Sequence, residues 1–245
     1  RGIRRAATRT GLLFMAVLFV VGLAGALLDV GLDRLVAVQF DPADPAAFEF
    51  VAPTLGVATL SFLVGVLSLV VVIAAIRTFV SDETESLPAA AFTRRMGWAW
   101  LNAFVGAIVF GLVVALGFVA FVVPGVFLAV ALAFWTVFVA VEDRNFLSAM
   151  RESWALTRGN RLNLFALGVV VFLVSLAVSI AFGILGFVGG GVALVLTQAA
   201  SAVTTVIGIA VLTTAYTTLV GEGEEPPESP AADAQTPRSG ATGGV

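Results

Sequence analysis

The sequence contains no cysteine, no histidine and no lysine, so all thirteen of its basic residues are arginine. The absence of cysteine excludes disulfides, thiolate nucleophiles and cysteine metal sites. The absence of histidine removes the commonest general base and metal ligand. Without lysine there is no side-chain amine for Schiff-base chemistry. We therefore expect no enzyme activity, no metal site and no cofactor.

Charge of either sign is also scarce. Only 12% of the 245 residues are charged, whereas 60% are hydrophobic and the mean hydropathy is +1.07. A water-excluded core could not hide this much apolar surface, so the bilayer must be the solvent for most of it. The net charge of −3 and an acidic carboxyl-terminal tail argue against nucleic acid as a partner. These features predict an integral membrane protein.

Six apolar stretches are each close to the ~20 residues that cross a bilayer. The predicted spans are Gly11–Leu28, Thr54–Ile76, Leu101–Val122, Pro124–Val141, Leu164–Gly186 and Thr197–Val220. We interpret the first as a retained span and not as a signal peptide, because it is long and offers no clear cleavage point. The segment Trp98–Val141 carries no charge over 44 residues and must fold back, with Pro124-Gly125 as the natural turn. The triplet Gly189–Gly191 predicts the turn between the last two spans.

Arginine is segregated between the two sides of these spans. One side carries Arg1, Arg4, Arg5, Arg9, Arg77, Arg94, Arg95, Arg144, Arg151, Arg158, Arg161 and Arg238. The other side has only Arg34, in a connection that also holds five carboxylates. Because cytoplasmic connections carry the excess of arginine, both termini are predicted to be cytoplasmic. The expected fold class is all-α, a polytopic transmembrane helical bundle of six spans within residues 1–220.

Two further patterns concern the organisation of the chain. Thr8-Arg9, Thr93-Arg94 and Thr157-Arg158 each precede an outward-going span. This repeat leaves two alternatives open, chance or three hairpins related by an axis along the membrane normal. From residue 221 the composition changes to glutamate, proline and small polar residues. Residues 221–245 are therefore predicted to form a disordered, acidic, proline-rich cytoplasmic tail.

The connection between the fourth and fifth spans, Asp143–Arg161, has the pattern of an amphipathic helix. Its apolar face would hold Phe146, Leu147, Met150 and Trp154, with arginines along the edge at heptad spacing. An arginine stem can lie on acyl chains while its guanidinium reaches lipid phosphates. We predict a helix in the cytoplasmic interface near 143–161. Its lipid-headgroup residues would be Arg144, Arg151, Trp154, Arg158 and Arg161. The alternative is that the apolar face packs on the spans.

No Asp, Glu or Arg lies inside a predicted span, although ion-coupled transporters usually keep one there. The candidates for intramembrane polar contacts are Asn102, Asn163 and Gln198, each expected to contribute about 1 kcal/mol. Small residues recur every four positions in two spans, which predicts close helix packing along both stripes. The stripes are Ala103, Ala107, Gly111 and Ala115 in the third span and Ser175, Ser179 and Gly183 in the fifth.

One stretch resembles known membrane families. It contains Pro124, then Glu142-Asp143, then Ser153 to Arg161 with Thr157 and Gly159. The resemblance covers Thr93–Val220. It is to six-helix haloarchaeal membrane proteins of unknown function and, more distantly, to the membrane domain beside glycerophosphodiester phosphodiesterases. It implies a six-helix membrane domain, and the lysine-free composition also looks like that of salt-adapted archaea. Phosphodiesterase chemistry belongs to a separate soluble barrel, so the resemblance implies no catalytic residue here.

The leading hypothesis is that the chain is a multipass protein of the cell membrane that has no catalytic activity and acts as a scaffold. Its partners would be membrane lipids, including anionic ones, and other membrane proteins. The alternative is a small-solute permease or channel, with a cavity among the third, fifth and sixth spans and a role for Gln198. A membrane-embedded hydrolase ranks third, because no serine has a histidine or lysine to activate it.

Overall fold

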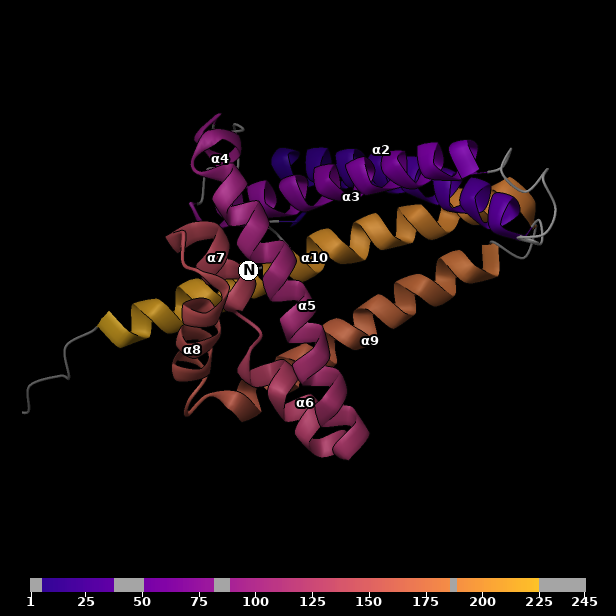
Figure 1. The fold of residues 1–245 in the computed structure, drawn as a ribbon. Coiled ribbons are helices and arrows are strands. Elements are labelled where there is room, and N and C mark those ends of the chain that lie inside the picture. The colour runs from indigo at the N-terminus through magenta and orange to yellow at the C-terminus, as the bar shows by residue number, and fades with distance from the viewer. Residues whose placement is uncertain (1–5, 38–50, 82–88, 186–188, 225–245) are drawn as a thin grey trace, which may run out of the picture.

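The computed structural model describes residues 6–37, 51–81, 89–185 and 189–224. In these ranges every regular element is an α-helix (Figure 1). The helices are α2 (Arg9–Ala37), α3 (Val51–Val80), α4 (Ala89–Thr93), α5 (Met96–Ala120), α6 (Val122–Ala131), α7 (Trp135–Glu142), α8 (Phe146–Leu156), α9 (Arg161–Leu185) and α10 (Gly190–Glu224). The predicted tail from residue 225 onward, together with Arg1, Arg4, Arg5 and Arg238, lies outside the described residues. The first four residues assigned to that tail continue α10.

Six helical segments in the described part of the chain are long and apolar enough to cross a membrane. They are Arg9–Asp33, Pro53–Val80, Met96–Ala120, Val122–Glu142, Arg161–Ile184 and Gly190–Gly221. Each contains most or all of one predicted span, which confirms the all-α, multipass fold class. The observed helices are longer at most ends, because a helix does not need to stop where the hydrocarbon layer does.

The predicted turn of the long uncharged segment is confirmed. Phe121 is extended, with φ −166° and ψ 157°, and separates α5 from α6. Pro124 lies in the first turn of α6, where its missing N–H costs nothing. The two helices touch at glycines: a Cβ on Gly117 would lie 2.8 Å from the Cα of Gly125. The second predicted turn is also present, with positive φ at Gly189 and Gly190.

The fourth span is two helices, α6 and α7, with a break at 132–134. Side chains of α8 and of Thr157, the residue directly after it, satisfy the backbone groups that this break frees. The Phe134 N–H donates to Ser153 Oγ at 3.1 Å, and the hydroxyls of Ser153 and Thr157 donate to the Ala131 carbonyl at 3.1 and 3.2 Å. All three contacts are buried, where an unpaired backbone group would cost about 1–3 kcal/mol. The break therefore depends on α8 lying against it.

The core lies at one end of the molecule, around α7. Its most buried large side chains include Ile73 and Phe79 of α3, Phe134, Val137 and Val139 at and within α7, and Val206 of α10. α8 packs on α7, and α10 packs on α2, α3 and α9. By contrast, no residue of α9 from Arg161 to Ile184 is buried. The predicted hairpins are present as contacting pairs, but α5 and α6 run across the direction of α2 and α3 (Figure 1).

Both predicted stripes of small residues are wrong. On α5 only Ala103 of its stripe is buried, while Ala107, Gly111 and Ala115 are exposed. The buried face of α5 is instead formed by Ala99, Asn102, Ala103, Gly106 and Gly117. On α9, Ser179 and Gly183 are exposed. A chain this rich in alanine and glycine offers several stripes, and the partner helix decides which one is buried.

Candidate functional site

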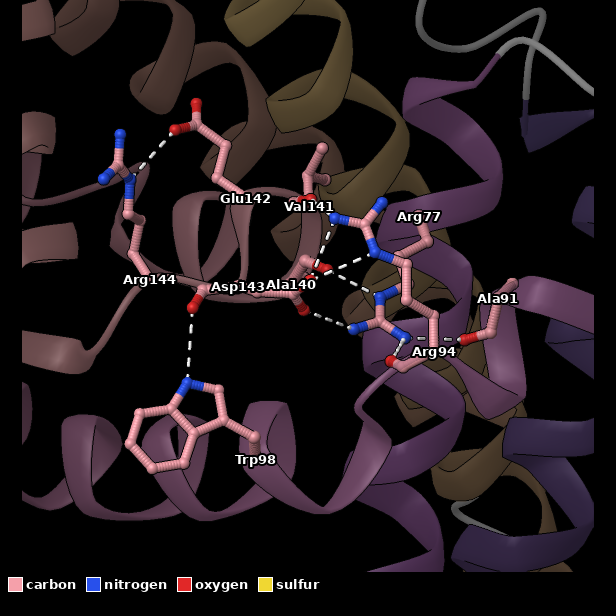
Figure 2. Close-up of polar contacts among 9 residues, drawn as sticks. All are labelled: Arg77, Ala91, Arg94, Trp98, Ala140, Val141, Glu142, Asp143 and Arg144. Atoms are coloured by element: carbon pink, nitrogen blue, oxygen red, sulfur yellow. Dashed lines mark hydrogen bonds and ion pairs between the residues drawn. The ribbon is translucent and has the colours of Figure 1, made fainter.

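The main cluster of charge joins three segments distant in the sequence (Figure 2). We call Arg77, Arg94 and Asp143 the Asp143 junction; they lie in the last turn of α3, after α4, and after α7. Asp143 Oδ1 accepts a hydrogen bond from Arg77 Nη2 at 3.3 Å. Its Oδ2 accepts from Arg94 Nε and Nη2 at 3.0 and 2.9 Å. The side chains of Arg77 and Asp143 are only 9% and 8% exposed, whereas that of Arg94 is 59% exposed.

Arg77 binds the carboxyl-terminal ends of two helices. Its Nε donates to the Ala140 carbonyl of α7 at 2.6 Å. Its Nη1 donates to the carbonyls of Ala91 in α4 and of Arg94, at 3.2 and 2.7 Å. A cation beside these carbonyls also complements the negative end of each helix dipole. Every nitrogen of this guanidinium is thus bound by the protein itself.

Asp143 is held through its backbone as well. Its φ of 54° and ψ of 28° are left-handed, a conformation that few residues other than glycine adopt and that aspartate tolerates better than most. Its carbonyl accepts a hydrogen bond from Trp98 Nε1 of α5 at 3.2 Å. Such a conformation persists when the surroundings determine it. The junction therefore fixes the sharp turn from α7 into α8.

A second cluster connects the end of α10 to α7 and α8. Tyr216 Oη donates to Glu142 Oε1 at 2.7 Å, and its ring packs edge-on against Phe138 with centroids 5.4 Å apart. Arg144 Nε lies 3.3 Å from Glu142 Oε2 and 3.2 Å from Glu152 Oε1. Both clusters bind helix ends to one another. Within the described residues no three carboxylates gather where a metal ion could bind.

The structure separates the five predicted headgroup residues into three groups. Arg144 is engaged by its two glutamates. Arg151 and Arg158 are exposed and form no ion pair with any described residue. Arg161 lies against two aromatic rings, with its Cζ 4.4 Å from the ring centroid of Trp154 and 4.7 Å from that of Phe127.

The amphipathic helix itself is confirmed as α8, although it is shorter than the predicted segment. Its inner face, with Ala149, Met150 and Ser153 buried, packs against α7. The alternative weighed from the sequence, an apolar face packed on the spans, thus describes most of this helix. Leu147 is the exception, at 53% exposed. The sequence pattern of α8 indicates that one face of the helix is covered. It does not indicate whether lipid or a neighbouring helix covers that face.

The three predicted polar residues lie on three different helices and form no common site. Asn102 of α5 is buried, donates to the Trp98 carbonyl at 2.9 Å and accepts from the Phe146 N–H at 3.1 Å, which holds the start of α8. Asn163 is exposed in the first turn of α9. Gln198 of α10 faces α2, so close to Gly22 that a Cβ there would collide with its Oε1.

None of the site residues predicted from the sequence is Asp143, Glu142 or Tyr216. A signal was available, because Glu142 and Asp143 end a span on the predicted arginine-rich side. Two carboxylates among so many arginines indicate ion pairs at that face. Which arginine would pair with which carboxylate depends on the packing of α3 against α7 and cannot be obtained from spacing.

Comparison with known proteins gives one match. No curated protein and no solved structure matches the chain. The chain matches a family model, which supports an uncharacterised membrane domain. This family model supports neither the resemblance to haloarchaeal proteins nor the resemblance to phosphodiesterase-associated domains. Residues 1–221 match a family described as a domain of unknown function, DUF7847, and the chain belongs to that family.

Proposed function

We propose that this protein is a non-catalytic component of the cell membrane that binds and organises lipids. The observation that carries this proposal is a groove of about 550 Å³ between α6, α9 and α10. Its walls include Val130 at the end of α6, Gly168 of α9 and Leu212 of α10, and every residue lining it is apolar. A second groove, of about 440 Å³, adjoins it at the start of α9 and shares Val126, Val130 and Phe165 with it.

The chemistry of this groove fits an acyl chain. Its volume lies within the range of roughly 300–1,000 Å³ typical of small-molecule sites. A polar solute would lose its hydration there without gaining a hydrogen-bond partner, which is costly. A hydrocarbon chain loses nothing of this kind. The apolar lining favours lipid binding over a small-solute permease, and Gln198 faces α2 and is not among the residues of the groove.

The polar clusters support a scaffold over an enzyme. Asp143 uses both carboxylate oxygens for ion pairs with arginines. The hydroxyls of Ser153 and Thr157 donate to the Ala131 carbonyl and so serve the helix break. We further propose, from the resemblance and the lysine-free composition, that the membrane is that of a salt-adapted archaeon. Partner membrane proteins would bind on the uncovered face of α9.

Filling the groove tests the proposal. Gly168 has no neighbouring atom within 4 Å of where a Cβ would be, so Gly168→Leu places a side chain in the groove without a clash near the backbone. Gly183→Leu is the matched control, because Gly183 lies on the same helix in equally open space and does not line the groove. Native mass spectrometry of the full chain, purified in mild detergent, counts retained lipids. We expect Gly168→Leu to lower retention severalfold and Gly183→Leu to leave it unchanged.

Equal retention by the two variants would contradict lipid binding in this groove. A wild-type protein that retains no lipid would refute the proposed function. Flux of a polar solute through reconstituted vesicles that is lost in Gln198→Ala would favour the permease alternative.

A further inference from the structure

Arg161 is a cation that lacks a counter-ion in the described part of the chain. No described carboxylate pairs with it, whereas Arg77, Arg94 and Arg144 each have one. Its Nε is buried and has no hydrogen-bond partner. Its only hydrogen bond among the described residues runs from Nη2 to the Trp154 carbonyl, at a long 3.4 Å. A guanidinium with five donors and one weak bond has capacity for an anion.

The side chain of Arg161 is nevertheless well positioned. Its guanidinium lies over the rings of Trp154 and Phe127, and these two rings meet edge to face with centroids 5.5 Å apart. Contact with two aromatic rings restrains the position of the guanidinium. An ordinary surface arginine has no such support. The arrangement thus resembles a preformed anion site more than a solvated charge.

The same arginine lines an apolar groove. Arg161 and Leu162 form one wall of the 440 Å³ groove, and Val123 and Phe127 of α6 form the other. All its lining residues except Arg161 are apolar. This groove adjoins the larger one between α9 and α10 and shares Val126, Val130 and Phe165 with it. Arg161 therefore lines this groove with its apolar stem, while its guanidinium contributes no surface to the groove.

We propose that Arg161 binds the phosphate of a phospholipid whose acyl chain lies in the two adjoining grooves. This inference rests on the proposed lipid-binding function and specifies the headgroup and the residue that recognises it. The occupant follows from complementarity, because a phospholipid joins an anionic phosphate to a long apolar chain, as the site joins Arg161 to its grooves. Free phosphate would use only the charge, and a diacylglycerol only the grooves.

The neighbouring arginines do not offer the same site. Arg144 is engaged by Glu142 and Glu152. Arg151 and Arg158 are exposed, stack on no described aromatic ring and line neither groove. Of the five headgroup residues predicted from the sequence, the proposal thus retains Arg161 as the ligand and Trp154 as its support. Arg158 becomes the matched control for a nonspecific effect of charge.

The test measures binding of two lipids with identical acyl chains to the full-length protein. Delipidated protein in mild detergent is titrated with phosphatidylglycerol or with diacylglycerol, and the bound fraction is read by native mass spectrometry. We expect the wild type to bind phosphatidylglycerol at least tenfold more tightly than diacylglycerol. Arg161→Gln should remove most of that difference, and Arg158→Gln should leave it intact. Arg161→Lys, which keeps the charge but stacks poorly, should fall between them.

Each other outcome has a defined meaning. If Arg161→Gln binds like the wild type, or Arg158→Gln loses as much, the headgroup site is refuted while the lipid groove stands. If glycerol phosphate competes as well as the whole lipid, the grooves take no part and the proposal fails. If neither lipid binds the wild type, the proposed function itself has failed. Circular dichroism and an unchanged unfolding midpoint confirm that each variant is folded.

Discussion

The side chain of Asp143 contacts two arginines while its backbone ends α7 in a left-handed turn, so charge and conformation are coupled at one residue. Arg77 opposite it is nearly as buried, and its remaining nitrogens bind carbonyl groups. A buried pair contributes little net stability relative to an apolar pair, but the loss of one partner leaves a charge uncompensated. The junction is therefore sensitive to single substitutions.

Asp143→Asn separates the two roles of this residue. Asparagine tolerates the left-handed conformation and keeps a similar shape, so the substitution leaves the turn intact and removes the negative charge together with one acceptor oxygen. We expect a loss of about 3 kcal/mol, at the low end for broken buried pairs because Arg77 keeps its carbonyl partners. The measurement is the free energy of unfolding in mixed micelles. Arg144→Gln is the control, because Arg144 is 52% exposed and its pairs should contribute less than about 1 kcal/mol.

If Asp143→Asn destabilises the protein no more than Arg144→Gln does, the junction is not a structural clamp. The sequence predicts that Arg77 and Asp143 both lie on the arginine-rich side, but it does not predict that they pair. Arg77 and Asp143 are 66 residues apart, and only the packing of α3 on α7 brings them together.

Packing of α5 against α7 and α8 depends on Gly106. A Cβ on Gly106 would lie 2.3 Å from the Trp135 ring of α7 and 3.0 Å from the Cβ of Phe146 in α8. Gly111, on the same helix, has no atom within 4 Å of that position. We expect Gly106→Ala to destabilise the protein by about 1–3 kcal/mol through overpacking. Gly111→Ala should stabilise it by about 0.5–1 kcal/mol, because alanine favours the helix.

The unfolding midpoints of these two variants, measured under one set of conditions, should move in opposite directions. A downward shift of similar size in both would mean that α5 does not pack on α7 through Gly106. A stripe of small residues read from the sequence would have treated Gly111 as the contact and missed Gly106, since spacing alone does not say which face meets the large ring of Trp135.

The existence of the helices was predictable and the interruption of the fourth span was not. Apolar runs without charge define helices in a bilayer, because the backbone there must bond to itself. The break at 132–134 carries no such signal, since Ala131 to Phe134 is apolar like its surroundings. Its bonds come from Ser153 of α8 and from Thr157 directly after α8, and a sequence pattern does not reveal partners that are 19 to 26 residues away.

At the scale of the whole molecule, the contact between Arg161 and Phe127 constrains depth in the membrane. The pattern of six full crossings places the turn at Phe121–Pro124 on the face opposite Arg161. In the structure Arg161 stacks on the Phe127 ring, and Val122 and Val123 share a groove with it. The exposed Arg151 and Arg158 must stay near water, since an arginine at the bilayer centre costs at least about 2.5–3.5 kcal/mol.

These constraints place the turn of the α5–α6 hairpin near the face that carries Arg158. The hairpin would then lie along that face instead of crossing the bilayer, and the segregation of arginine would be preserved because both of its ends stay on that side. Single cysteines introduced into this cysteine-free chain test the prediction without background. We expect a membrane-impermeant maleimide to label Val123→Cys and Arg158→Cys from the same face, and Gly189→Cys from the other.

Labelling of Val123→Cys together with Gly189→Cys would restore six full crossings. It would also separate Phe127 from Arg161 by most of a bilayer, and the grooves at the start of α9 would then not exist in the membrane.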